Sequence, residues 1–167
     1  SYNGHIALRV AQDWSDYLDM AEKAGMNMQL ESVMFPLDLK RRHDDLVLER
    51  NKQHRMEAMK GTQHSIRREA EQLEKQFHIE NIYKKIRKIY EYDGAEYIIR
   101  VPEGAKDILQ ESKFLDHCIQ RGTRYFERIS VRESYILFLR KKSDPNTPWY
   151  TLEVEPGGTV RQKRSYS

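Results

Sequence analysis

The spacing of the apolar residues changes near residue 90, and this change constrains the fold more than any other feature. Before it, apolar side chains recur at steps of three and four, as at Ile66, Ala70, Leu73 and Phe77, which is the period of an amphipathic helix. After it, short apolar runs alternate with turn residues, as is typical of strands. The sequence therefore predicts an α+β chain with a helical region at residues 1–90 and a β-rich module at residues 91–167. A single compact domain made of both parts stays open as an alternative.

The apolar spacing within residues 1–90 predicts three helical segments. The first contains Trp14, Tyr17, Leu18 and Ala21 at helical spacing. Asp13 or Ser15 can cap its start, and Gly25 can end it. A long charged helix is expected to begin at residues 36–38, where a proline and an aspartate suit a first turn, and Gly61 is its weak point. Residues 82–89 either prolong the following helix or already belong to a strand.

The second half predicts a hairpin, a helix and a three-stranded meander. Residues 90–99 predict a hairpin with the Asp-Gly pair at 93–94 as its turn. Residues 105–120 predict a short helix, and strands are expected at 134–140, 149–155 and 159–163. Turn residues separate these strands. The expected C-terminal architecture is a small antiparallel sheet packed with a helix.

Composition limits the classes of function. Of the 167 residues 33% are charged and 38% are hydrophobic, so many charges must lie on solvated helix faces. The net charge of +3, from 29 basic and 26 acidic residues, is too small to establish a nucleic-acid partner by itself. No run of about 18 apolar residues occurs, so we expect no membrane partner. The single cysteine excludes an internal disulfide and suits a cytoplasmic location. Because Ser1 stands where Met opens a complete chain, we expect a piece of a longer protein.

The sequence gives no support for a bound metal or cofactor. The histidines at positions 43, 54, 64 and 78 lie ten or more residues apart. The chain has no Cys-x-x-Cys motif, no His-Glu-x-x-His motif and no glycine-rich phosphate loop.

Four polar residues of the C-terminal third occupy positions that secondary-structure propensity does not explain. They are His117, Arg140, Glu153 and Gln162. His117 precedes Cys118 near the end of an apolar helix, and the other three lie in the three successive strands of the meander. If the sheet packs against the helix, these side chains can converge on a pocket.

Each of these residues has a functional and a structural interpretation. His117 could activate the Cys118 thiol, but adjacent residues on a helix point about 100° apart. A buried cysteine beside a hydrogen-bonded histidine is the simpler interpretation. Arg140 could hold a phosphate or carboxylate while Glu153 acts as a base. Alternatively, the two residues form an ion pair across neighbouring strands or face solvent.

Basic residues are concentrated in the helical part. Residues 38–90 contain 14 Lys and Arg against 9 Asp and Glu. Two segments are candidates for contacts with nucleic-acid phosphates: Lys84, Lys85, Arg87 and Lys88, and Arg161, Lys163 and Arg164. Tyr83, Tyr90 and Tyr92 lie beside the first segment and could stack on bases. The alternative is a solvated helix face without a ligand.

Several short motifs follow one another in a fixed order. They are Phe35-Pro36, His43-Asp44, Leu115-x-His117-Cys118, Tyr125-x-Glu127-Arg128-Ile129, Ile136-x-Phe138-Leu139-Arg140, Pro145-x-x-Pro148-x-Tyr150-Thr151-Leu152-Glu153 and Gln162. In this order, from about Trp14 to the end, the chain resembles the PcfJ-like proteins. Many relatives carry a tyrosine where this chain has Gly122, and Tyr125 is its nearest equivalent. The resemblance implies a setting in bacterial conjugative plasmids, phages and other mobile elements, without an established reaction.

Three hypotheses of function follow. The first is a mobile-element accessory protein that contacts DNA or RNA through the two basic segments, with the four polar residues forming a pocket. The second is an enzyme acting on nucleic acid, with Glu153 as base and Arg140 as electrophilic clamp. The third is a scaffold whose long helix binds another mobile-element protein, which an exposed apolar stripe would favour. The sequence leaves open whether the chain is an enzyme.

Overall fold

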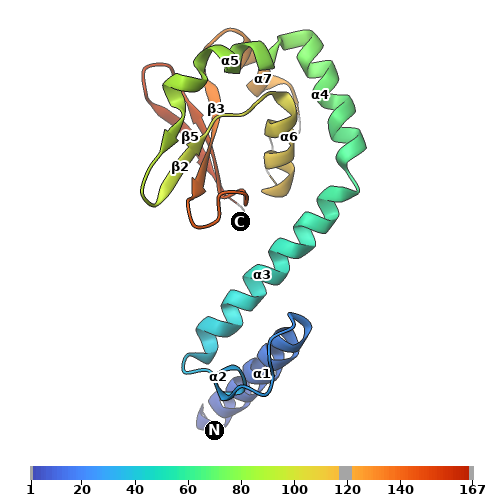
Figure 1. The fold of residues 1–167 in the computed structure, drawn as a ribbon, viewed down its shortest axis with the longest axis vertical. Coiled ribbons are helices and arrows are strands. Elements are labelled where there is room, and N and C mark those ends of the chain that lie inside the picture. Colours follow the sequence, from blue (N-terminus) through green and yellow to red (C-terminus); the bar gives the residue numbers. More distant parts are fainter. Residues whose placement is uncertain (1, 117–121, 166–167) are drawn as a thin grey trace. The chain divides into compact units, whose positions relative to one another are not determined.

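The computed structural model describes residues 2–116 and 122–165 (Figure 1). Its contacts divide the chain into two compact units, Ser1–Glu57 (unit 1) and Ala58–Ser167 (unit 2), and each is described by itself. The boundary lies inside helix α3 (Leu39–Lys60), whereas the helices give way to strands after Tyr90. None of the described helices is both long enough and apolar enough to cross a membrane.

Unit 1 is helical and has a small core. Helix α1 (Tyr2–Lys23) and the one-turn helix α2 (Glu31–Met34) share the buried residues Tyr17, Ala21 and Val33. The Tyr17 hydroxyl donates to the carbonyl of Val33 at 2.7 Å, and the indole of Trp14 donates to that of Met34 at 2.8 Å. These contacts hold α2 against α1.

Helix α1 is longer than its apolar pattern predicted. Asp13 and Ser15 lie inside it, so the prediction of a cap at either residue is wrong. Residues 6–12 contain no glycine or proline, so the helix begins well before its apolar face does. Its end is as predicted, because Gly25 adopts a left-handed φ of 75° just beyond it. Helix α2 was not predicted, since four residues ahead of Pro36 are too few to show a helical period.

Helix α3 is the long charged helix that the sequence predicted, but it begins at Leu39, so Pro36 lies before its first turn and not in it. The backbone N–H of Arg41 donates to the Asp38 carboxylate at 3.0 Å, so Asp38 caps the first turn. The helix ends immediately before Gly61. None of its residues is buried, although Leu39 and Leu46 pack against the core of unit 1.

Unit 2 opens with two helices that meet at His78. Helix α4 (Gln63–Phe77) has the buried face that the spacing predicted, made of Ile66, Ala70 and Leu73. His78 takes a left-handed conformation, with φ of 54°, and separates α4 from α5 (Ile79–Tyr90). Residues 82–89 are therefore helical, and the alternative that they begin a strand is wrong.

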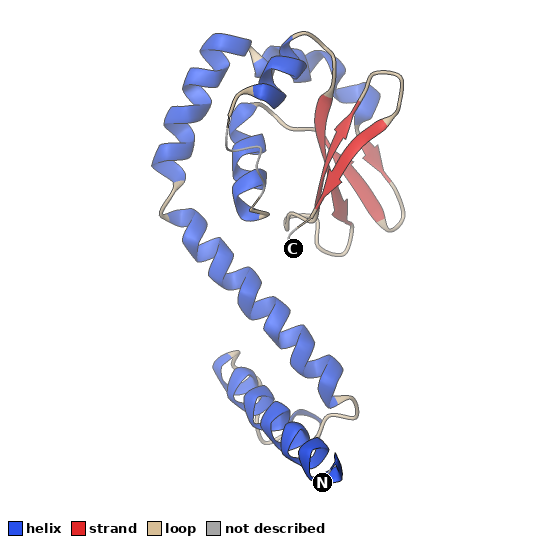
Figure 2. Ribbon diagram, turned by 180° about the vertical axis from the view of Figure 1, so that it is seen from behind, coloured by secondary structure: helices blue, strands red, loops and turns tan. Residues whose placement is uncertain are grey.

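The sheet of unit 2 has five antiparallel strands in chain order (Figure 2). They are β1 (Tyr92–Asp93), β2 (Tyr97–Arg100), β3 (Tyr135–Lys141), β4 (Tyr150–Val154) and β5 (Val160–Arg164). The predicted hairpin and the three predicted strands are confirmed. The turn of the hairpin lies at residues 94–96 and not at 93–94, because Asp93 pairs with Ile98 in the sheet. The hairpin and the meander form one sheet, because β2 pairs with β3 from Tyr97 opposite Lys141 to Arg100 opposite Phe138.

Two short helices connect β2 to β3. Helix α6 (Ala105–Phe114) confirms the first part of the helix predicted over residues 105–120. Leu115 and Asp116 are no longer helical, and residues 117–120 lie outside the described part of the chain. Helix α7 (Arg124–Ser130) was not predicted, since its seven residues cover only two turns.

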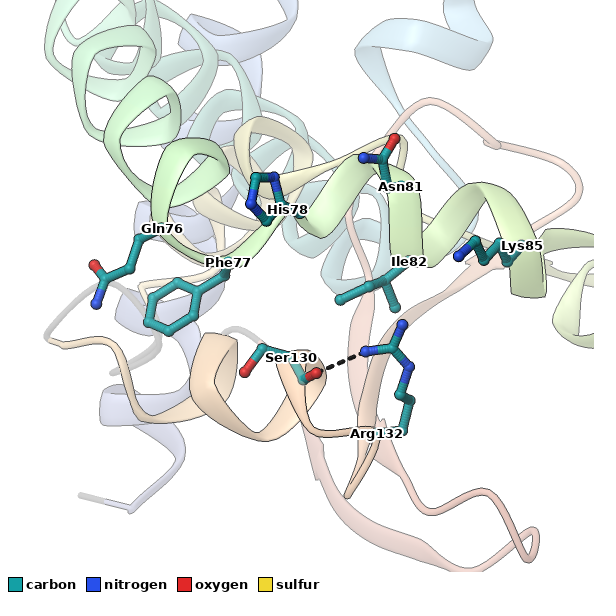
Figure 3. Close-up of a pocket in the computed structure, with 8 residues that line it drawn as sticks. All are labelled: Gln76, Phe77, His78, Asn81, Ile82, Lys85, Ser130 and Arg132. Carbon is teal, nitrogen blue, oxygen red and sulfur yellow. Dashed lines mark hydrogen bonds between the residues drawn. The ribbon is translucent and has the colours of Figure 1, made fainter.

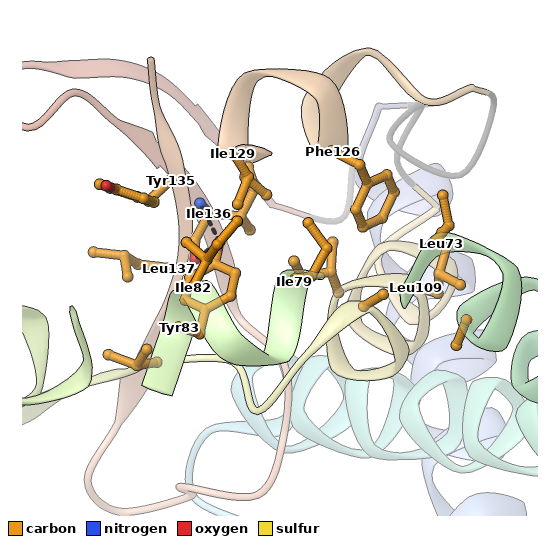
Figure 4. Close-up of a cluster of buried hydrophobic side chains, with 14 of the residues drawn as sticks. Leu73, Ile79, Ile82, Tyr83, Leu109, Phe126, Ile129, Tyr135, Ile136 and Leu137 are labelled. Carbon is orange, nitrogen blue, oxygen red and sulfur yellow. Dashed lines mark hydrogen bonds between the residues drawn. The ribbon is translucent and has the colours of Figure 1, made fainter. Parts of the chain in front are cut away.

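The core of unit 2 joins these helices to the sheet (Figure 4). Its fully buried members include Ile79 and Tyr83 of α5, Phe126 and Ile129 of α7, and Ile136 of β3. Every helix of unit 2 contributes at least one buried side chain. The sheet and the helices of unit 2 therefore depend on each other for burial.

One tyrosine completes the hydrogen bonding of the sheet. The hydroxyl of Tyr83 accepts from the backbone N–H of Ile136 at 2.8 Å and donates to the carbonyl of the same residue at 2.9 Å. Ile136 lies beyond Phe138, the last residue of β3 that pairs with β2. Burial raises the pKa of the Tyr83 hydroxyl, so it stays protonated and serves both as donor and as acceptor.

Candidate functional site

A buried carboxylate lies where α7 meets the sheet. Glu153 of β4 is 2% exposed. Its Oε2 accepts from Nη1 of Arg128 at 2.8 Å and from Oγ of Ser134 at 2.7 Å. Its Oε1 has no hydrogen-bond partner among the described residues. One oxygen is thus held by an ion pair and a hydroxyl, while the other keeps its acceptor capacity.

Gln162 lies directly across from Glu153 in the sheet. The register of β4 and β5 pairs the two residues, so their side chains share one face. The Gln162 Oε1 accepts from the Tyr125 hydroxyl at 3.3 Å and from Nη2 of Arg164 at 3.0 Å. Thr151, two residues before Glu153 on the same face, also has a buried hydroxyl without a partner in the described part of the chain.

These residues form a polar cluster on one face of the sheet. We define it as Tyr125, Arg128, Ser134, Thr151, Glu153 and Gln162. Of the four polar residues singled out in the sequence, the fold therefore brings Glu153 and Gln162 together. His117 and its neighbour Cys118 lie outside the described residues. Within the described ranges no group of three or more His, Cys, Asp and Glu could hold a metal ion.

Arg140 belongs to a separate buried ion pair. Its Nη2 lies 2.5 Å from Oε1 of Glu111 on α6, and its Nε lies 3.2 Å from Oε2. Its Nη1 donates to the carbonyl of Pro145 at 2.8 Å. The β3 residue opposite Glu153 is Ile136, four positions before Arg140, which is roughly 13 Å along a strand. Arg140 and Glu153 therefore do not pair with each other.

Glu111 is a buried charged residue that the sequence analysis missed. It is 3% exposed. Burial raises the pKa of its carboxyl to about 7, although Arg140 favours the charged form. Its position among the apolar residues of α6 was the available signal, because a glutamate on a buried helix face needs a cationic partner.

The basic segment of α5 divides into exposed and structural residues. Lys84, Lys85 and Lys88 are exposed on the side opposite the buried Ile82 and Tyr83. No carboxylate of the described residues lies within ion-pair distance of these three lysines. They therefore form an unpaired cationic face, here called the lysine face.

Arg87 has a different role from the lysines around it. Its Nη1 donates to the carbonyl of Val101 at 3.0 Å, and its Nη2 donates to that of Pro102 at 3.1 Å. Its Nη2 also lies 3.3 Å from the carboxylate of Glu103. Arg87 thus holds the segment that follows β2 against α5.

Two of the basic residues of β5, Arg161 and Arg164, already contact other side chains. Arg161 lies 3.1 Å from a carboxylate oxygen of Glu133 and 3.4 Å from one of Glu155. Arg164 donates to Gln162, and Lys163 is exposed. The cationic surface of this strand is therefore weaker than its sequence suggests.

The three tyrosines near α5 differ in exposure. Tyr83 is fully buried, and Tyr90 is half-buried with its ring 5.6 Å from that of Tyr135. Tyr92 alone of the three is exposed, at 63%. Tyr92 is therefore the one of them that a base could reach.

Comparison with known proteins identifies a family for this chain. The model of the PcfJ-like protein family matches residues 13–166. The uncharacterized protein Lin1253/Lin1744 of Listeria innocua serovar 6a is 26% identical over 142 residues, which are 85% of this chain and 27% of that protein. The chain thus spans about a quarter of this relative's length. No solved structure matches. Since the family model covers most of the chain, the protein belongs to the PcfJ-like family.

Proposed function

We propose that this PcfJ-like chain contacts nucleic acid through the lysine face of α5, as an accessory protein of a bacterial mobile element. One observation carries the proposal. Three lysines share the exposed side of one helix and have no carboxylate partner in the described part of the chain. Unpaired ammonium groups gain the most when they replace the counterions of a phosphate backbone.

The geometry of α5 suits contacts with successive phosphates. Lys84 and Lys88 are one helical turn apart, about 6 Å along the axis, with Lys85 beside them. The opposite side of the helix is fixed in the core through Ile79, Ile82 and Tyr83. A rigid helix presents its cations with little further loss of backbone entropy on binding.

Binding is better supported than the enzyme hypothesis. That hypothesis needs Glu153 as base and Arg140 as clamp at one substrate. Arg140 is held by both oxygens of Glu111, and one oxygen of Glu153 is held by Arg128. A guanidinium already paired in this way has little capacity left for a phosphate.

The proposal is tested by measuring the affinity of the full chain for labelled single- and double-stranded DNA and RNA at about 50 mM salt. Replacing Lys84, Lys85 and Lys88 together by Gln should weaken binding at least about tenfold and reduce the slope of log affinity against log salt. The matched control replaces Lys75, Lys106 and Lys113, which are exposed on α4 and α6. No binding by the wild type, or equal loss in the two triple variants, overturns the proposal.

Exposed apolar residues of unit 1 favour a second candidate function, the protein-interaction scaffold. Phe35 is 60% exposed and Leu48 is 67% exposed. Such residues become buried when a partner protein docks. A photo-crosslinker at Leu48 should then capture one discrete protein in cells that carry the mobile element, and a crosslinker at the exposed Lys113 should not.

A further inference from the structure

An open pocket lies where the junction of α4 and α5 faces the end of α7 (Figure 3). Its lining residues are Gln76, Phe77, His78, Asn81, Ile82, Lys85, Ser130 and Arg132. Phe77 and Ile82 give it apolar walls, and the remaining residues are polar or basic. The pocket is separate from the polar cluster, with which it shares no residue.

The charge of this lining has one sign. Lys85 and Arg132 are cationic, and no lining residue is acidic. The carboxylate nearest in sequence to Arg132 is that of Glu133, which is engaged by Arg161 at 3.1 Å. A concave site lined by cations and without carboxylates favours a small anion.

The guanidinium of Arg132 is positioned for such a ligand. Its Nη1 donates to the carbonyl of Ser130 at 2.7 Å, and the side chain extends toward α5 (Figure 3). No carboxylate of the described residues lies within ion-pair distance of it. Four further N–H donors are therefore available, in the planar arrangement that binds phosphate through two parallel hydrogen bonds.

Two residues that line the pocket, His78 and Arg132, adopt a left-handed backbone conformation. His78 has φ of 54° and Arg132 has φ of 58°. The left-handed region costs a non-glycine residue roughly 1 kcal/mol. These conformations end α4 and follow α7, so they turn both chain segments at the rim of the pocket.

We propose that this pocket binds a terminal phosphate, the monoester at the end of a nucleic-acid strand or on a mononucleotide. The proposal rests on the proposed function and names the part of the nucleic acid that is recognised. A monoester carries nearly two negative charges at neutral pH, against one for a backbone diester. Two cations around one pocket match the monoester better. Lys85 also belongs to the lysine face, so a strand that ends in the pocket can continue along Lys84 and Lys88.

The test compares one single-stranded oligonucleotide in three forms, with a 5′-phosphate, with a 3′-phosphate and with hydroxyl ends. One phosphorylated form should bind the wild-type chain about tenfold more tightly than the hydroxyl form. Arg132→Asn should abolish this difference, and asparagine tolerates the left-handed backbone of this position. Lys85→Gln, at an exposed helical site, should reduce the difference in affinity between the phosphorylated and hydroxyl forms. This variant tests the pocket if Arg132→Asn does not fold.

The matched control is Lys84→Gln, because Lys84 lies on the lysine face but outside the pocket. It should weaken the binding of all three oligonucleotides by the same factor and leave the ratio of their affinities unchanged.

Equal binding of all three forms by the wild type overturns the phosphate site but not the proposed role of the lysine face. If none binds, the proposed function fails, and titration of the isotope-labelled chain with inorganic phosphate and a nucleoside monophosphate decides the pocket. Shifts at Asn81 and Ser130, both in the lining of the pocket, that Arg132→Asn removes then support the phosphate site. Their absence overturns it.

Discussion

Glu111, Arg140 and Glu153 lie almost completely out of contact with water, and each has an oppositely charged partner. Glu111 and Arg140 join α6 to β3, while Arg128 and Glu153 join α7 to β4. A buried charge without a partner costs several kcal/mol. The two pairs therefore fix where each short helix sits on the sheet.

Removing the charge of Glu153 should destabilise the protein. Glu153→Gln leaves the guanidinium of Arg128 without its carboxylate, at an expected cost of about 2–4 kcal/mol in the free energy of unfolding. Thr151→Val is the matched control on the same strand face. Its hydroxyl has no partner among the described residues, so the substitution should be neutral or stabilising. Denaturant unfolding of both variants measures this, and a larger loss for Thr151→Val contradicts it.

Glu111 should make stability depend on pH near neutrality. Burial raises the pKa of its carboxyl in the folded state from 4.5 to about 7, so the folded chain binds more protons than the unfolded chain between these values. The contribution of this group is complete below about pH 4.5 and is lost as the pH rises through about 7. The wild type should therefore lose stability relative to Glu111→Gln over this interval. Parallel unfolding profiles of the two proteins contradict the expectation.

For single residues, the sequence predicted which polar side chains are unusual better than it predicted the residues that pair with them. Arg140 and Glu153 stood out because a charged residue ends or interrupts an apolar strand. Their partners Glu111 and Arg128 lie on helices, 29 and 25 residues away in sequence. Strand alternation predicts a half-solvated position for Glu153, but α7 places Arg128 over it. Such pairing follows from how helices dock on the sheet, which local patterns do not encode.

Among the secondary-structure elements, α3 and α4 show how differently helices can be stabilised. Helix α3 has 22 residues, none of them buried, whereas α4 has 15 and buries three apolar side chains. An isolated helix in water is marginal, so most helical stability comes from packing. Helix α3 depends on its cap and on side-chain pairs such as Lys40 with Asp44 at 3.0 Å.

Hydrogen exchange should separate these two helices. Backbone amides of residues 47–57 should exchange at least about tenfold faster than those of residues 66–76, because local opening of α3 exposes no core. Mass spectrometry of the full chain at neutral pH measures both segments in one experiment. Equal protection would mean that α3 is covered by a partner, for example a second copy of the chain.

The elements that the sequence predicted well are those with strong local signals. Asp38 and Gly61 bound α3, and Gly94 opens the turn of the hairpin, although Asp93 still lies in β1. The start of α1 and the helices α2 and α7 were missed. A helix start without a cap residue, and helices of four and seven residues, leave no periodic pattern in the sequence.

For the whole molecule, the contacts within the structure divide the chain inside α3, whereas helices give way to strands after Tyr90. Unit 2 contains the sheet together with α4 and α5. These helices supply Leu73, Ile79 and Tyr83 to the core that covers β3. The β-rich module expected at residues 91–167 lacks them.

A fragment of residues 58–167 should therefore fold by itself. It keeps the complete larger core, and we expect a cooperative thermal transition and dispersed amide resonances. A fragment of residues 91–167 should show neither, because its sheet would expose the face that α5 covers. Circular dichroism and NMR spectra of both fragments measure this, and a folded 91–167 fragment contradicts the expectation.

The hydroxyl of Tyr83 also has a consequence for folding kinetics. It reaches across 53 residues of sequence to the backbone of Ile136, and β3 cannot complete its hydrogen bonds there from strands alone. The hydrogen bonds of β3 at Ile136 are therefore complete only when α5 is docked on the sheet. Contacts between such distant residues form slowly, because a long loop must close before they are made. The rate-limiting step in folding of unit 2 should therefore be this closure rather than formation of its hairpins or helices.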